Sequence, residues 1–123
     1  MAHPRRLHTS IKRIAPGPRL SGVVIHGDTV YLAGHVVADA SLGVKGQTVA
    51  ILKRIDERLA EAGTSRERLL SVTIYLTDMS RFDEMNEAWD AWLAGAAPPA
   101  RATVGAALAS PEYLVEISAI AAR

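Results

Sequence analysis

Short apolar or alternating stretches, separated by turn residues, occur five times along this chain. Such stretches predict β-strands, because successive side chains of a strand point to opposite faces. The predicted strands cover residues 22–26, 29–33, 69–77, 101–108 and 113–121. Gly27 and Asp28 separate the first two strands and favour a tight hairpin turn. The first two strands are therefore expected to pair antiparallel.

Two other stretches carry apolar residues at helical spacing. From Gln47 to Ala62 these residues recur every three or four positions, and Gly63 stands where a left-handed C-terminal cap belongs. A second helix is predicted to follow Ser80, its expected N-cap, and to end at Gly95. The predicted order of elements is β-β-α-β-α-β-β.

These elements predict a single α+β domain in which one mixed β-sheet carries both helices on one face. The opposite face would then present small and partly polar side chains. Its expected members are Thr73, Tyr75, Thr103, Gly105, Leu114, Glu116, Ser118 and Ile120. A half-polar face of this kind suits contact with sister subunits better than it suits a dry core, so we expect an oligomer.

The composition and net charge of the chain exclude several classes of function. The chain has 123 residues, a net charge of +1 and no cysteine. The near-neutral charge gives no electrostatic case for binding nucleic acid or an anionic membrane. The absence of cysteine excludes disulfides, thiolate metal sites and a cysteine nucleophile. No apolar run is long enough to span a bilayer, and no signal peptide is recognised, so a cytoplasmic protein is expected.

The N-terminal part is more basic than the rest of the chain. Residues 1–27 hold four arginines and one lysine but no acidic residue. We interpret residues 1–13 as a basic, solvated leader rather than an RNA contact, and place the domain at residues 14–123. Residues 15–18 include two prolines, which lack backbone donors, so this segment is predicted to be a loop.

Few residues have both a reactive side chain and a position in a predicted element that indicates a functional site. Arg101 and Thr103 lie two positions apart in a predicted strand and therefore share one face. Glu116 stands among apolar residues, where a carboxylate is costly unless it is paired or functional. Arg101 and Glu116 form either a structural ion pair across adjacent strands or part of a site. Trp89 and Trp92 are interpreted as packing residues. The histidines lack metal-ligand spacing, so no metal site is predicted.

An ordered set of short motifs resembles the RidA (YjgF-like) family of small reactive-intermediate deaminases. The matching stretches are residues 15–18, 31–34, 47–48, 59–63, 72–78, 82–86, 99–101 and 115–121. No single stretch is specific to the family. Their common order and spacing, from about residue 15 to the C-terminus, carry the resemblance.

The resemblance implies a chorismate-mutase-like α+β fold, a homotrimer and ligand clefts between subunits. It also implies hydrolysis of enamines and imines such as 2-aminoacrylate to 2-oxo acids and ammonia, without a metal or organic cofactor. The family's substrate-binding arginine falls on Arg101 and would clamp the substrate carboxylate. Its active-site glutamate falls on Glu116 and would assist the attacking water. Its strand-end glycine falls on Gly34, and its helix asparagine falls on Asn86, which by spacing alone could equally be a cap or a cross-element hydrogen-bonding group.

Three positions depart from the pattern of the best-characterised family deaminases. Arg19 replaces a tyrosine near the cleft, Ala33 replaces a serine or threonine, and Thr103 replaces a cysteine. Arg19 either adds a second cation, which would favour a dicarboxylate, or points to solvent. An alternative function is therefore a trimeric protein that binds small carboxylates with little turnover. RNA cleavage, a third reading, is disfavoured by the near-neutral charge.

Overall fold

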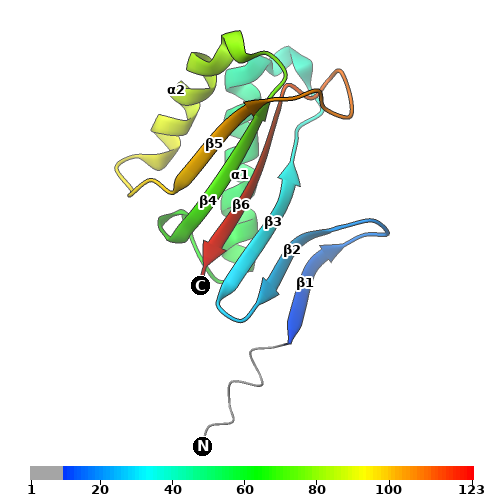
Figure 1. Ribbon diagram of the computed structural model, residues 1–123, viewed down its shortest axis with the longest axis vertical. Coiled ribbons are helices and arrows are strands. Elements are labelled where there is room, and N and C mark those ends of the chain that lie inside the picture. The colour runs from blue at the N-terminus through cyan, green and yellow to red at the C-terminus, as the bar shows by residue number, and fades with distance from the viewer. Residues whose placement is uncertain (1–9) are drawn as a thin grey trace, which may run out of the picture.

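The computed structural model describes residues 10–123, which form one six-stranded sheet and two α-helices (Figure 1). The strands are β1 (Ile11–Pro16), β2 (Ser21–His26), β3 (Thr29–His35), β4 (Leu69–Leu76), β5 (Ala100–Gly105) and β6 (Val115–Ala122). The helices are α1 (Gly43–Glu61) and α2 (Phe82–Leu93). Short 3₁₀ turns precede α1, β4 and α2, namely η2 (Ala40–Leu42), η3 (Arg66–Arg68) and η4 (Met79–Arg81).

The sheet is mixed, as predicted, with the strand order β1-β2-β3-β6-β4-β5. Neighbouring strands are antiparallel except β4 and β5, which run parallel. Parallel neighbours need a crossover connection, and α2 provides it. Both helices lie on the same side of the sheet (Figure 1), which confirms the predicted α+β layering.

The covered face of the sheet and the apolar stripes of the helices form the hydrophobic core. Val72, Ile74 and Leu76 of β4 are buried at every second position, which confirms the predicted alternation. Helix α1 begins at Gly43, earlier than predicted, because the turn η2 leads directly into it. It ends where predicted, and Gly63 adopts the left-handed conformation (φ +80°) that favours glycine.

Strand β1 corrects the sequence-based expectation for the N-terminal part. It spans Ile11–Pro16 and pairs antiparallel with β2, so it includes residues 11–13 of the predicted leader and the start of the predicted loop at 15–18. Its side chains are almost all exposed, and it therefore lacks the hydrophobic alternation that marks a strand in a sequence. Backbone pairing along the sheet edge is what makes it a strand. The rest of the predicted leader, residues 1–9, lies outside the described residues.

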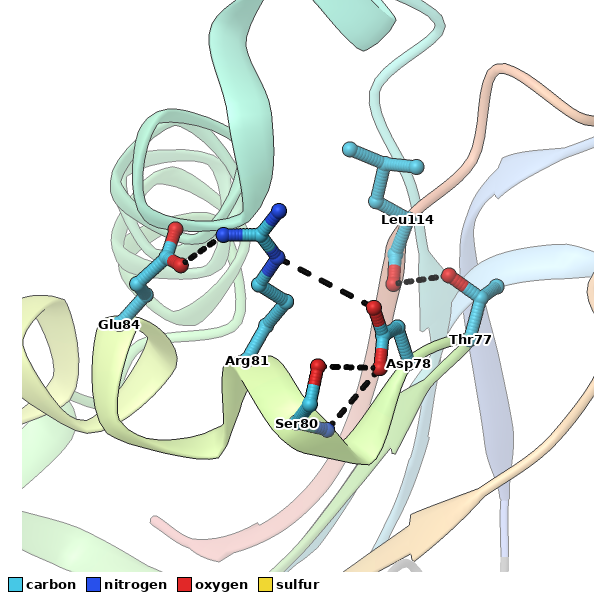
Figure 2. A network of polar contacts seen from close by, with 6 residues as sticks. All are labelled: Thr77, Asp78, Ser80, Arg81, Glu84 and Leu114. Carbon is cyan, nitrogen blue, oxygen red and sulfur yellow. Dashed lines mark hydrogen bonds and ion pairs between the residues drawn. The ribbon is translucent and has the colours of Figure 1, made fainter.

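The segment that leads into α2 is capped differently from the prediction (Figure 2). Asp78 is the N-cap of the 3₁₀ turn η4, and its carboxylate accepts hydrogen bonds from the Ser80 backbone N–H at 3.0 Å and from the Ser80 hydroxyl at 2.7 Å. The N-cap of α2 itself is Arg81, which makes no side-chain capping bond. These bonds hold the pKa of Asp78 below its usual range. Arg81 then pairs with Glu84 at 2.8 Å. The prediction failed because the 3₁₀ turn η4 separates Ser80 from the helix.

Candidate active site

Arg101 lies near the start of the edge strand β5. In the sheet it stands beside Val72, whose side chain is buried on the covered face. The Arg101 side chain is therefore on that face, where it reaches α2. Its Nη1 donates a hydrogen bond to Asn86 Oδ1 at 2.8 Å. The ring centroids of Trp89 and Phe82 lie 5.1 and 6.0 Å from its Cζ.

The surroundings of Arg101 stabilise its charge without neutralising it. An amide oxygen, two aromatic rings and the Met85 thioether at 4.0 Å are all neutral groups, and Arg101 forms no ion pair within residues 10–123. Burial lowers the pKa of the guanidinium, although arginine stays charged at any physiological pH. The charge of Asp90 opposes this effect on the pKa, but Asp90 forms no ion pair with Arg101. A partly buried cation whose N–H donors meet no carboxylate favours an anion from outside. A carboxylate fits best, because it accepts two parallel N–H donors.

Glu116 lies near the start of β6 on the opposite, uncovered face, beside Tyr75 of β4. Its carboxylate lies against Gly34, where an added Cβ would come within 2.8 Å of the Glu116 carboxyl carbon. The pairing of β3 with β6 is irregular between Leu32 and His35, so the backbone of Gly34 departs from the regular ladder. The fold thus brings together two candidate residues that are far apart in the sequence.

The structural ion pair considered for Arg101 and Glu116 does not exist. Strand β4 lies between β5 and β6, and the two residues stand beside positions 72 and 75 of β4, roughly 10 Å apart along the strand. Their side chains also point to opposite faces of the sheet. The prediction failed because the sequence does not reveal that these strands are not neighbours. Within one chain, the two side chains therefore cannot contact the same small ligand.

Thr103 shares the face of Arg101, as predicted, but this is the covered face. The parallel register aligns Thr103 with Ile74 and Gly105 with Leu76, both buried. The expectation that Thr103 and Gly105 lie on the uncovered face is therefore wrong. The Thr103 hydroxyl is buried and has no hydrogen-bond partner among the described residues.

Arg19 stands apart from the other candidate residues. It is exposed, in the connection between β1 and β2. The hairpin register places this connection beyond Ser21, at the same end of the sheet as Gly34. Arg19 forms no ion pair with any residue of the described part of the chain.

The rest of the uncovered face is hollowed between β3, β4 and β6, where a cavity of about 250 Å³ lies open. Its lining residues are Tyr31, Leu32, Ser71, Thr73, Ser118, Ala119 and Ile120. Hydroxyl and apolar groups alternate there, as predicted for most of this face. The ring of Tyr31 is 43% exposed, which leaves apolar surface without a cover within the chain.

The contacts of Phe82 and Trp89 with Arg101 are not among the sequence-based predictions. Phe82, Met85, Asn86 and Trp89 follow the spacing of one helix face, so the signal was present. What the spacing cannot show is which strand this face meets. His35 is also not among the candidate site residues that the sequence predicts. Its Nδ1–H donates to the Ala33 carbonyl at 2.6 Å, and burial lowers the pKa of its imidazole.

Two classes of site find no support in the described residues. Within 10–123, no three histidine, aspartate or glutamate side chains cluster so that they could hold a metal ion. No helix in this part of the chain is long and apolar enough to cross a membrane.

Comparison with known proteins identifies the family. The sequence model of the family described as Endoribonuclease L-PSP matches residues 10–123. A RutC family protein of Haemophilus influenzae is 42% identical over 113 residues, which cover 91% of this chain and 97% of that protein. The RutC family protein YoaB of Escherichia coli is 41% identical over 113 residues, with 92% and 98% covered.

Solved structures agree with the sequence comparison. A member of the YjgF protein family from Neisseria meningitidis superposes with a TM-score of 0.87 at 39% identity, covering 94% of this chain and 97% of that one. A member of the same family from Mycobacterium tuberculosis gives a TM-score of 0.83 at 29% identity, covering 93% and 100%. The fold is thus the chorismate-mutase-like α+β fold of these proteins. The chain belongs to the Endoribonuclease L-PSP family, also called the YjgF/RidA family.

Proposed function

We propose that this protein hydrolyses enamine and imine intermediates of the 2-aminoacrylate type to 2-oxo acids and ammonia. The observation that carries the proposal is Arg101, a partly buried cation whose direct contacts are neutral groups. Such a cation recognises a small carboxylate. Membership of the YjgF/RidA family supports the reaction type. We also propose that the protein is cytoplasmic and that its mechanism uses neither metal nor organic cofactor.

Arg101 contributes substrate binding and polarisation. Its guanidinium holds the substrate carboxylate through two charge-assisted hydrogen bonds. The bound carboxylate is then neutralised, so it withdraws more electron density from the neighbouring carbon. The imine tautomer is favoured over the enamine, and its carbon becomes a better electrophile.

Glu116 handles the proton transfers. Its carboxylate accepts a proton from water as the water oxygen bonds to the imine carbon, and the imine nitrogen takes up a proton from solvent as the C=N π bond opens. The resulting carbinolamine then collapses: Glu116 returns its proton to the nitrogen, the C–N bond breaks and ammonia leaves, and the hydroxyl gives its proton to solvent as the carbonyl forms. One water is consumed and one ammonia released. General acid–base help from one positioned group contributes about 10²–10⁴-fold.

The complete site lies between protomers. Gly34 and Glu116 come from one chain, while Arg101 with its neighbours Asn86 and Thr103 comes from the next. Support comes from the geometry, since the two groups are on opposite faces of one sheet. The uncovered face offers the contact surface for a sister subunit, and we propose a homotrimer on the basis of the family resemblance.

The departures at Arg19 and Ala33 bear on the substrate. The exposed guanidinium of Arg19 lies at the same end of the sheet as Gly34 and supplies a second positive charge there. A dicarboxylate, or another more anionic imine, would use both arginines. Ala33 offers no hydroxyl where many relatives carry one, which favours a binding function with weak turnover as the second candidate.

The test measures ammonia and 2-oxo acid released from amino-acid-derived imines generated in situ. Arg101→Ala should lower kcat/KM by about 30-fold or more, because one partner of a buried charge pair is removed. Arg101→Lys should restore only part of the rate, since lysine lacks the parallel donors. Arg68→Ala, which removes an exposed arginine, is the matched control. Equal rates for wild type and Arg101→Ala would remove Arg101 from the mechanism.

The second candidate is tested by a thermal-shift screen with 2-oxo acids and dicarboxylates. A ligand that raises Tm for the wild type but not for Arg101→Ala, without detectable turnover of imines, would establish binding without catalysis. RNA cleavage, named in the family's description, is not part of the proposal because the net charge is only +1. Any effect on RNA that disappears on deletion of residues 1–9, which precede β1, would indicate charge attraction alone.

A further inference from the structure

One face of α2 is built around the Arg101 guanidinium. Phe82, Met85, Asn86 and Trp89 recur at the spacing of a single helix face, and each is in contact with Arg101. Trp89 comes nearest among the rings, with its centroid 5.1 Å from Cζ, and only 5% of its surface is exposed. That distance lies within the range of a cation–π interaction.

We propose that Trp89, assisted by Phe82, is a positioning residue that holds the Arg101 guanidinium ready to bind a carboxylate. This inference rests on the proposed function of Arg101. It assigns the indole a role beyond core packing, because the ring supports the charged group that meets the ligand.

The choice of an aromatic ring has a physical reason. A carboxylate beside Arg101 would also stabilise its charge, but it would occupy the N–H donors that the substrate needs. An aromatic face attracts the cation through its π electrons and leaves those donors available. Asn86 Oδ1 accepts from Nη1 alone, which fixes the orientation of the guanidinium plane. Together the ring and the amide restrict a side chain that would otherwise sample many rotamers.

The partner tryptophan of the same helix provides a control. Trp92 lies 5.5 Å from Trp89, yet it contacts a different arginine: its ring is 4.7 Å from Arg66 Cζ, and its Nε1–H donates to Asp56 Oδ2 at 2.9 Å. Substitution of Trp92 therefore perturbs α2 without removing any contact to Arg101.

The first experiment compares kinetics of three variants. Trp89→Leu should raise KM for the imine by roughly threefold to thirtyfold and lower kcat by less, because the guanidinium chiefly binds the substrate carboxylate and also polarises the imine. Trp89→Phe keeps a π face and should recover most of this loss. Trp92→Leu should leave KM at the wild-type value. A Trp89→Leu enzyme with wild-type KM, or a Trp92→Leu enzyme with the same rise in KM, would overturn the inference.

The second experiment measures the change in indole fluorescence when ligand is added. A tryptophan that only stabilises the fold is not expected to respond to the ligand. The chain has two tryptophans, so Trp92→Phe leaves Trp89 as the single reporter. Titration with 2-oxobutyrate should change Trp89 emission with the affinity that calorimetry gives, since the bound carboxylate neutralises the cation beside the ring. Trp89→Phe, with Trp92 as reporter, should show no such change.

The outcomes separate the two proposals. Calorimetric binding of 2-oxobutyrate without a Trp89 response would overturn the positioning role and leave the proposed function standing. No calorimetric binding to the wild type would overturn the carboxylate site itself, and with it the role of Trp89.

Discussion

The carboxylate of Glu116 occupies space that any side chain at residue 34 would take. An added Cβ there would come within 2.8 Å of the Glu116 carboxyl carbon. The atoms in conflict belong to the end of a flexible side chain, so the backbone need not move. Gly34 is therefore a requirement of the site more than of the fold.

Gly34→Ala should accordingly lower imine hydrolysis by about tenfold or more while changing the unfolding free energy by about 1 kcal/mol or less. Turnover and urea denaturation on the same preparation check both values. Gly105→Ala, where the new Cβ would lie 3.2 Å from the Met79 side chain and 3.9 Å from the Leu76 carbonyl oxygen, is the control and should keep activity. An active Gly34→Ala enzyme would show that Glu116 need not lie where the structure has it.

His35 makes the stability depend on pH. Burial lowers the pKa of its imidazole from the ordinary 6.5, with Arg58 and Arg54 adding to the effect and the Ala33 hydrogen bond opposing it. Because the folded pKa is the lower one, the unfolded chain binds more protons as the pH falls. The contribution of His35 is thus complete above about pH 6.5 and is lost on acidification towards the folded pKa.

Thermal melts should therefore show that wild-type Tm falls more steeply between about pH 7.5 and pH 5 than the Tm of His35→Gln. Glutamine cannot titrate, so the difference between the two curves isolates the imidazole. Parallel curves would mean that the folded and unfolded proteins bind protons at His35 equally.

Gln47 links elements that are distant in the sequence. It is fully buried in α1, and its amide makes three hydrogen bonds: Nε2 donates to the Asp39 carbonyl at 3.0 Å and to the Glu112 carbonyl at 2.8 Å, while Oε1 accepts from the Leu114 N–H at 2.9 Å. These bonds hold the segment that leads into β6. The position of Glu116 therefore depends on α1.

Gln47→Leu leaves three backbone groups without their partner and should lower the unfolding free energy by about 2–4 kcal/mol. Urea denaturation measures the change. Thr48→Val is a matched control, since Thr48 is equally buried but its hydroxyl only bonds the Val44 carbonyl within the helix, at 2.7 Å. A loss no larger than that of Thr48→Val would show that the Gln47 amide contributes little beyond its volume.

At the level of elements, a strand or helix could be predicted when its sequence shows one buried and one exposed face. Strand β4 and helix α1 were recognised because one face of each is buried and the other is not. Strand β1 was missed because almost all its side chains are exposed and only its backbone pairs. The cap of α2 was misassigned because Ser80 lies inside the 3₁₀ turn η4, which Asp78 caps, and this turn precedes the helix.

The whole molecule carries the two parts of the proposed site on opposite faces of its sheet. Arg101 reaches the covered face at the β5 edge, whereas Glu116 and Gly34 lie on the uncovered face. A single protomer therefore cannot hold one small ligand with both groups. Assembly of several chains is expected to complete the site, with a mass near three times 13.2 kDa for the proposed trimer.

Mixed oligomers test this arrangement directly. Arg101→Ala and Glu116→Gln should each be inactive alone, but a co-expressed equal mixture should regain about a quarter of wild-type activity, because one random pairing in four joins two intact halves. Light scattering confirms the subunit number, and the ammonia assay measures recovery. An oligomer whose mixture stays as inactive as its parents would place both groups in the same protomer.

The order of residues along the chain was sufficient for the periodic features: the core stripes, the glycine at the end of α1, the number of helices and the family motifs. Each depends on neighbours within a few positions, so the pattern is local. The distribution of Arg101 and Glu116 over two faces, the insertion of β6 between β3 and β4, and the rings beside Arg101 came only from the folded chain. These features depend on strand register and on which helix meets which strand, and both follow from contacts between distant segments that no local spacing records.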